Sequence, residues 1–98
     1  MEYAGVQETA GLGVIIMEKT PKVARVKPEA DWHLRVLFDN GIEKRYDCQQ
    51  LMNRPAFDAL RDESLFRLVQ VDPGGYGVSW NADIDLSEYE LWMRGVGL

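Results

Sequence analysis

KVARVKPEADWHLRVLFDNGIEKRYD, the stretch from Lys22 to Asp47, predicts three consecutive β-strands. Within it, the segment from Trp32 to Phe38 alternates apolar side chains at even positions with mostly polar ones at odd positions, which is typical of a strand with one buried face. Asp39-Asn40-Gly41 then has the composition of a hairpin turn. The stretch therefore predicts an antiparallel sheet whose strands follow one another along the chain.

Two turn lengths are possible for this hairpin, and they differ in which residues of the third strand lie on the buried face. A two-residue Asn40-Gly41 turn would place charged residues of the third strand opposite buried positions, which is costly. A three-residue loop with Gly41 in the left-handed conformation instead pairs Leu34 with Tyr46 and Val36 with Lys44. We expect this second register, with the lysine stem covering apolar surface. The opposite face then carries His33, Arg35, Glu43, Arg45 and Asp47.

After the hairpin the sequence predicts short helices and a second hairpin. Pro55 to Leu60 and Glu63 to Leu68 have short apolar faces, and Asp62 is placed to cap the second of them. Asp72-Pro73-Gly74-Gly75 predicts a turn between strands at Leu68–Val71 and Tyr76–Trp80. Ser87-Glu88-Tyr89-Glu90 matches a capping box that opens a last helix ending at Gly95. The predicted class is α+β, a mostly antiparallel sheet of about five strands in two hairpin units, covered by two or three short helices.

The length of 98 residues suffices for one small hydrophobic core. We expect a single α+β domain over residues 20–98, preceded by an N-terminal extension over residues 1–19. Residues 1–16 carry three glycines and no helical period. Two interpretations of the extension stay open: a disordered or loosely attached arm, or an edge strand at Gly13 to Met17 that joins a sheet, including one of a neighbouring molecule.

Composition and charge exclude several classes of protein. With 46% apolar and 28% charged residues the chain has the composition of a globular protein. Its net charge of −5 repels a phosphate backbone, so we expect no binding to nucleic acid. The single cysteine, Cys48, fits a reducing compartment, which predicts a cytoplasmic location. The apolar run from Leu12 to Met17 is too short to span a membrane, so no membrane partner is expected.

No catalytic or metal-binding signature is found in the sequence. His33 is expected opposite Asp47, whereas Cys48 points to the other face, so a cysteine–histidine dyad would require the strand alternation to break. Cys48 is therefore predicted to be a small buried hydrophobe. Asp83 and Asp85 are interpreted as loop and helix-capping residues. The three tryptophans are interpreted as core residues. We expect no enzyme activity and no cofactor.

Three segments carry a resemblance to a known family. KVARVKPEADWHLRVLFDNGIEKRYD, PAFDALRDESLFRLVQVD and WNADIDLSEYEL together resemble the small bacterial family catalogued as domain of unknown function 2442. Where that family usually has a proline and a glycine between the tryptophan and the Ala-Asp pair, this chain has only Asn81 between Trp80 and Ala82-Asp83, which shortens the loop. The resemblance implies a compact α+β domain with no established activity, in a family whose genes often stand beside another small gene, an arrangement reminiscent of toxin and antitoxin pairs.

Two functions therefore remain open. The first is a non-enzymatic protein-interaction module that docks a partner protein through a sheet face or edge. In its narrower form this module is the neutralising member of a toxin–antitoxin-like pair. The second is a small-ligand-binding or sensor domain with a pocket lined by Trp80, Tyr46 or Trp92 and polarised by Arg35 or Asp83. A homodimer is compatible with either function. The candidate partner or ligand surface consists of Arg35, Arg45, Asp47, Trp80 and Asp83.

Overall fold

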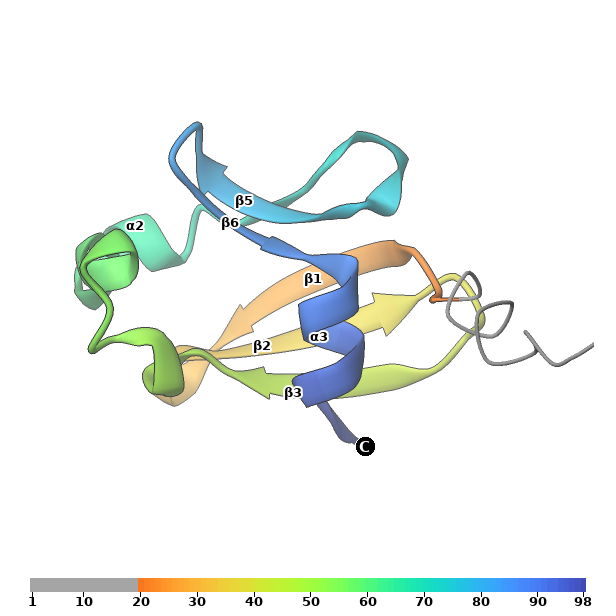
Figure 1. Cartoon of the computed structure of the whole chain (residues 1–98). Coiled ribbons are helices and arrows are strands. Elements are labelled where there is room, and N and C mark those ends of the chain that lie inside the picture. Colours follow the sequence, from red (N-terminus) through yellow and green to blue (C-terminus); the bar gives the residue numbers. More distant parts are fainter. Residues whose placement is uncertain (1–19) are drawn as a thin grey trace, which may run out of the picture.

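The computed structural model describes residues 20–98, which form two antiparallel sheets joined by short helices (Figure 1). The N-terminal extension, with the edge strand considered for Gly13 to Met17, lies outside the described residues. The larger sheet has the strand order β1-β2-β3-β7, from β1 (Val23–Glu29), β2 (His33–Phe38), β3 (Glu43–Asp47) and β7 (Val96–Gly97). The smaller sheet has the order β4-β5-β6, from β4 (Gln70–Val71), β5 (Gly77–Asn81) and β6 (Ile84–Ser87). The predicted α+β class is confirmed.

The helices are short, and the two N-terminal caps that the sequence predicts, at Asp62 and Ser87, are present. Asp62 accepts a hydrogen bond from the backbone N–H of Ser64 at 2.9 Å, and Ser87 Oγ accepts one from the N–H of Glu90 at 3.1 Å. Within residues 20–98 the α-helices are α2 (Glu63–Phe66) and α3 (Glu88–Arg94), and the 3₁₀ helices are η1 (Ala30–Trp32), η2 (Cys48–Leu51), η3 (Pro55–Arg61) and η4 (Pro73–Gly75).

The central hairpin adopts the expected register. Leu34 pairs with Tyr46 and Val36 with Lys44. Gly41 has φ +87°, and its N–H donates to the carbonyl of Phe38 at 2.9 Å, which closes the three-residue loop. The side chain of Lys44 bends over the ring of Trp92, and its Nζ donates to the Trp92 carbonyl at 2.6 Å, near the C-terminal end of α3. Lys44 is thereby accommodated beside the core.

The hydrophobic core lies between the two sheets. Figure 1 shows the smaller sheet lying over the larger one, with α3 crossing between β6 and the β3 edge. The larger sheet contributes the even-numbered side chains of β2 and Tyr46, the smaller sheet contributes Val78, and α3 contributes Leu91. The fully buried large side chains are Leu34, Val36, Phe38, Tyr46, Leu60, Phe66, Val78 and Leu91.

Two strands were missed by the sequence analysis, and one interpretation is corrected. Asp85 lies in β6 rather than at a helix cap, because Ile84 and Leu86 alternate with it and point into the core. Asp83 lies in the β5–β6 turn, as expected of a loop residue, and Asn81 Oδ1 caps this turn by accepting from the backbone N–H groups of Asp83 and Ile84 at 2.8 and 3.0 Å. The other missed strand, β7, has only two residues.

Candidate interaction surface

The larger sheet has a second face that the core does not occupy, and we refer to it as the outer face. Strand alternation places odd-numbered side chains of β1, β2 and β3 on it. A bulge between Val23 and Arg25 lets Val23 enter the core while Arg25 stays outside, although both are odd-numbered. The outer face consists of Arg25, Lys27, Glu29, His33, Arg35, Leu37, Glu43, Arg45 and Asp47.

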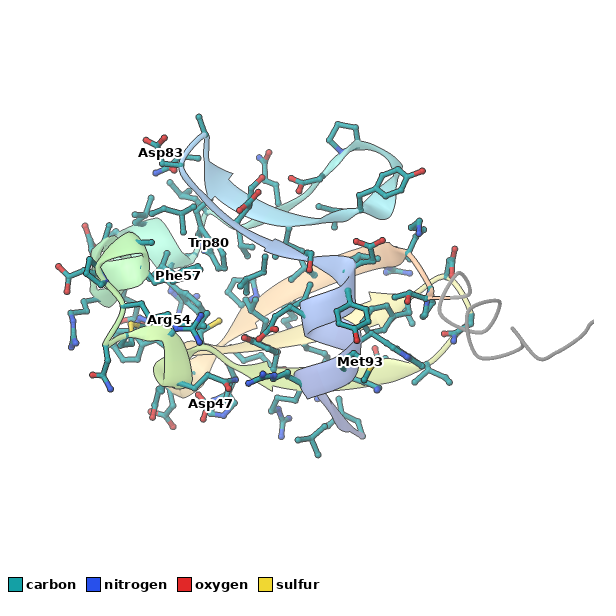
Figure 2. The ribbon with its side chains drawn as sticks, in the orientation of Figure 1. Asp47, Arg54, Phe57, Trp80, Asp83 and Met93 are labelled. Carbon is teal, nitrogen blue, oxygen red and sulfur yellow. The ribbon has the colours of Figure 1, made fainter. Side chains whose placement is uncertain are left out.

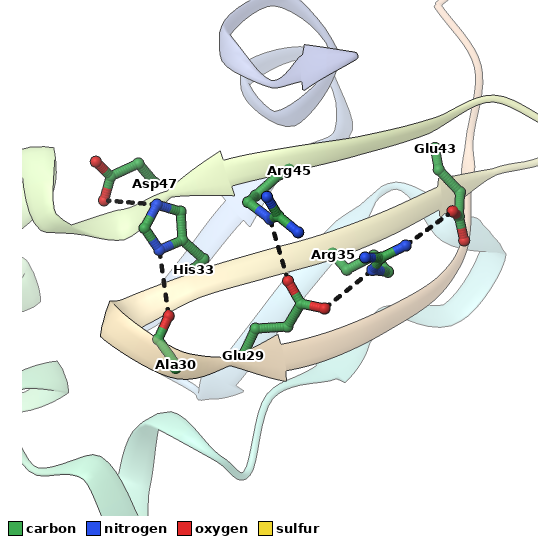
Figure 3. Close-up of polar contacts among 7 residues, drawn as sticks. All are labelled: Glu29, Ala30, His33, Arg35, Glu43, Arg45 and Asp47. Carbon is green, nitrogen blue, oxygen red and sulfur yellow. Dashed lines mark hydrogen bonds and ion pairs between the residues drawn. The ribbon is translucent and has the colours of Figure 1, made fainter. Parts of the chain in front are cut away.

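Glu29 is the centre of the polar contacts on this face (Figure 3). Arg35 and Arg45 stand directly opposite each other on β2 and β3, where two like charges repel. Glu29 reaches across from β1 and accepts from Arg35 Nε at 2.9 Å and from Arg45 Nε at 3.2 Å, one with each carboxylate oxygen. Arg35 also donates through Nη1 to Glu43 at 3.2 Å. One carboxylate thus ties three strands together and offsets the repulsion between the two arginines.

The charges of this network reinforce one another. The hydrogen bond from Arg35 lowers the pKa of the Glu29 carboxyl below its usual value, and the hydrogen bond from Arg45 acts in the same direction, while partial desolvation opposes both. The hydrogen bond to Glu29 in turn raises the pKa of Arg35. The two arginines therefore favour the ionised form of Glu29, which accepts a hydrogen bond from each of them.

His33 and Asp47 continue the outer face toward the end of β3. They pair across the strands as expected, with His33 Nε2 at 3.9 Å from Asp47 Oδ1. The other ring nitrogen, Nδ1, lies 3.2 Å from the carbonyl of Ala30. Asp47 also accepts from the N–H of Gln49 at 2.8 Å and so caps η2. Asp47 therefore has a local structural role in addition to its exposed position.

A hollow of about 580 Å³ opens at one end of the outer face, around the β1–β2 connection. Lys27, Arg45 and Arg67 contribute cations to its wall, and Glu29 and Asp31 contribute carboxylates. Among its contacts within the described chain, Arg45 uses Nε for Glu29, which leaves its two terminal nitrogens available on the outer face. The complete lining is Lys27, Pro28, Glu29, Ala30, Asp31, His33, Arg45 and Arg67.

The charge of this face differs in sign from that of the whole chain. Four cationic side chains on the outer face stand against three carboxylates, so it carries one net positive charge with His33 neutral. The whole chain carries a net charge of −5. Within residues 20–98 the outer face therefore does not share the net negative charge of the chain.

Only three of the five candidate site residues lie on this surface. Arg35, Arg45 and Asp47 share the outer face, whereas Trp80 belongs to the core at 7% exposure, and its Nε1 donates to the carbonyl of Phe66 at 2.9 Å. Asp83 lies at the tip of the β5–β6 turn, and Figure 2 shows it at the top of the view, with Asp47 at the bottom. The structure does not bring Trp80 or Asp83 together with the two arginines.

The expected pocket around Trp80, Tyr46 and Trp92 is filled by packing. Tyr46 is fully buried, and its hydroxyl donates to Glu90 Oε2 at 2.6 Å. The ring of Trp92 packs edge-on against Phe38 with 5.0 Å between centroids. Of the polarising residues considered, Arg35 lies on the opposite side of the sheet from this core. The hollows found on the surface of residues 20–98 are lined by side chains other than Tyr46, Trp80 and Trp92.

Cys48 is confirmed as a buried residue. Its side chain is fully buried, and desolvation, with a smaller effect of the nearby Asp47, raises the pKa of the thiol to about 12. A thiol with that pKa stays protonated at neutral pH and is a poor nucleophile. Within residues 20–98 there is also no group of three or more histidine, cysteine or acidic side chains placed to hold a metal ion.

Glu29, the central residue of the outer face, was not among the predicted site residues, and neither were Lys27 and Arg67. The signal for Glu29 was its position at the end of the first strand, which an antiparallel register places opposite His33. Finding it would have required the β1–β2 register, which depends on the bulge near Val23 and on the η1 connection. Arg67 directly follows α2, and only tertiary structure brings it to the hollow.

Comparison with known proteins gives one match. A family described as protein of unknown function (DUF2442) matches residues 23–97, which includes every strand of both sheets. Neither the curated proteins nor the solved structures contain a match to the chain. None of the helices in the described part of the chain is long and apolar enough to cross a bilayer.

Proposed function

The chain belongs to the DUF2442 family of proteins of unknown function, and on that premise we propose that it is a non-enzymatic protein-interaction module whose outer face docks an acidic segment of a partner protein. The observation that carries this proposal is the preorganised arginine pair. Arg35 and Arg45 are both exposed by about two-fifths, at 37% and 42% of their side chains, yet Glu29 holds them in fixed positions. Side chains that are ordered before binding lose less entropy when a partner arrives.

The shape of the outer face supports an acidic partner. The hollow beside Arg45 has cations from three elements, Lys27 on β1, Arg45 on β3 and Arg67 after α2. A carboxylate of the partner that enters it would meet the free terminal nitrogens of Arg45, in the geometry that guanidinium groups prefer for carboxylates. The net negative charge of the whole chain disfavours a polyanion such as nucleic acid, whose many phosphates would be repelled elsewhere.

The family resemblance adds a narrower form of the proposal. In it the partner is a protein encoded beside this one, and docking on the outer face neutralises that protein as an antitoxin neutralises a toxin. This form predicts that expression of the neighbouring gene alone slows growth and that co-expression of this chain restores growth.

The test is a quantitative pull-down from native host lysate with the tagged full chain and three charge-reversal variants. Lys27→Glu and Arg45→Glu change the outer face. Arg54→Glu makes the same change of charge at an exposed residue of the η2–η3 connection and serves as the matched control (Figure 2). We expect one partner that the wild type and Arg54→Glu retain in stoichiometric amount and that both outer-face variants lose.

Carbodiimide cross-linking then identifies the contact. It joins an amine to a carboxylate, so Lys27 Nζ should link to an aspartate or glutamate of the partner. Lys27→Arg keeps the charge and should keep the partner while losing this cross-link. Retention of the partner by all variants, cross-links that avoid Lys27, or no retained partner at all would each contradict the proposal.

A further inference from the structure

A cavity of about 440 Å³ opens beside Trp32 and shares no lining residue with the hollow of the outer face. Its volume lies within the range of about 300–1,000 Å³ that is usual for small-molecule sites. The lining side chains come from η1, η2, the η2–η3 connection and η3. They are Trp32, Gln49, Met52, Asn53 and Arg61.

Trp32 is fixed in an unusual conformation at this cavity. Its φ is +59°, and the preceding Asp31 has φ +60°, so two consecutive residues other than glycine are left-handed. Such a conformation is uncommon for a bulky side chain and persists only where the surroundings determine it. Here the indole Nε1 donates to the carbonyl of Leu60 at 2.6 Å, and the ring lies 6.4 Å from that of Phe66. The position of the indole is therefore set by the protein itself.

The other walls of the cavity are also tied in place. Gln49 Nε2 donates to the carbonyl of Asp31 at 2.9 Å, which links η2 to the left-handed turn. Arg61 donates through Nη2 to the carbonyl of Met52 and through Nε to Asp58, both at 2.9 Å. The segments around the cavity are thus connected by hydrogen bonds, and the cavity is preformed.

The chemistry of the lining indicates the class of ligand. Trp32 and Met52 offer an aromatic ring and a thioether, which suit a flat apolar surface. The charge of Arg61 is balanced by Asp58, so the cavity has no excess cation to attract an anion. Asn53 offers both a donor and an acceptor, a combination that recognises the edge of a nucleobase.

We propose that this cavity binds a small neutral heteroaromatic molecule of the nucleobase type. Its ring stacks on the indole of Trp32, and its polar edge faces Asn53 and the remaining terminal nitrogen of Arg61. Stacking of bases on aromatic side chains is a common source of such affinity. The cavity shares no lining residue with the hollow of the outer face, so different variants test small-molecule binding and protein docking.

The experiment is a titration followed by ¹H–¹⁵N NMR, because the chain has three tryptophans and each indole N–H gives its own signal. Trp32→Phe identifies the signal of Trp32. The probes are adenosine and guanosine, with ribose, phenol and adenosine 5′-monophosphate for comparison. We expect a saturable shift of the Trp32 signal with the nucleosides, no shift with ribose, and weaker binding of phenol and of the monophosphate.

Two alanine variants test the assigned edge contact. Asn53→Ala removes a lining amide from an exposed position and should weaken adenosine binding at least tenfold. Gln50→Ala removes an amide from neighbouring η2 that does not line the cavity and should leave binding unchanged. No Trp32 shift with either nucleoside, equal shifts at all three indoles, equal binding by both variants, or tighter binding of phenol or of the monophosphate would overturn the proposal.

Discussion

The inner and outer faces of the β1–β3 sheet are built from alternate residues of the same strands, yet they are held together in different ways. On the inner face Leu34, Val36 and Tyr46 are fully buried and contact the smaller sheet and α3. On the outer face the corresponding neighbours, Arg35 and Arg45, keep more than a third of their side chains exposed and are held by ion pairs with Glu29. Of two adjacent residues in a strand, one therefore faces the apolar core and the other faces water.

The difference separates stability from binding. Burial of apolar surface is the main favourable contribution to folding, whereas ion pairs between exposed groups contribute little because water and salt screen them. The outer face can therefore carry charges suited to a partner without loss of fold stability. Four substitutions test this division, from the largest expected effect to the smallest.

Leu34→Ala should lower the free energy of unfolding by about 2–5 kcal/mol, because it removes buried methyl groups and leaves a cavity. Leu37→Ala makes the same chemical change on the outer face of the same strand and should stay within about 1 kcal/mol of wild type. Urea unfolding followed by tryptophan fluorescence measures both. Similar losses in the two variants would show that the outer face also contributes substantially to stability.

Tyr46→Phe should lower the free energy of unfolding by about 1.5–3 kcal/mol, because it removes a hydrogen bond to a charged group, the carboxylate of Glu90. This bond joins the inner face to α3. Tyr89→Phe is the matched control, since Tyr89 is 47% exposed, and its effect should be within about 0.5 kcal/mol. Thermal unfolding followed by circular dichroism distinguishes them, and equal effects would mean that the hydrogen bond to Glu90 adds no stability.

Much of the larger sheet was predictable because its pattern is local. The alternation from Trp32 to Phe38 and the cost of burying charge were enough to select the register and so to place Arg35, Arg45 and Asp47 on one face. By contrast β7 has only two residues after α3 and owes its pairing to β3, and β6 is four residues long. Strands this short carry too little periodicity to be identified by pattern alone, and β4, equally short, was predicted because a turn signal follows it.

The site was less predictable than the fold. Trp80 and Asp83 are only three residues apart, but Trp80 is a core residue and Asp83 lies at a turn. Their closeness in sequence did not indicate that their surroundings differ. The Trp32 cavity was also missed, because it depends on left-handed residues at Asp31 and Trp32. Two such residues other than glycine in succession contradict local conformational preference, and tertiary contacts with η2 and η3 determine them.

Gly41→Ala should lower the free energy of unfolding by about 1–2 kcal/mol, because φ at this position is +87° and an L-residue is strained there. The turn at Gly41 sets the register of β2 against β3, and this register decides which side chains lie on each face. Gly97→Ala is the control, since an added methyl group meets no atom within 4 Å at either position and Gly97 lacks a positive φ. Urea unfolding should show a loss in the first variant alone. A comparable loss in both would assign the effect to the methyl group rather than to the backbone.

The smallest effect on stability is expected from Arg35→Gln on the outer face. Its consequence can be measured by titrating the carboxyl group of Glu29. Arg35 lowers the pKa of this carboxyl in the folded state, so its ion pairs add stability above the unfolded glutamate value of about 4.3 and lose it as the pH falls through the folded value. A ¹³C NMR titration of the Glu29 carboxyl should give a midpoint below that of an ordinary glutamate. Arg35→Gln should raise this midpoint and make the urea midpoint less sensitive to acid, with little change at pH 7. An unchanged Glu29 midpoint in Arg35→Gln would mean that the arginine does not hold the carboxylate in solution, and the preorganisation on which the proposed docking face depends would then be absent.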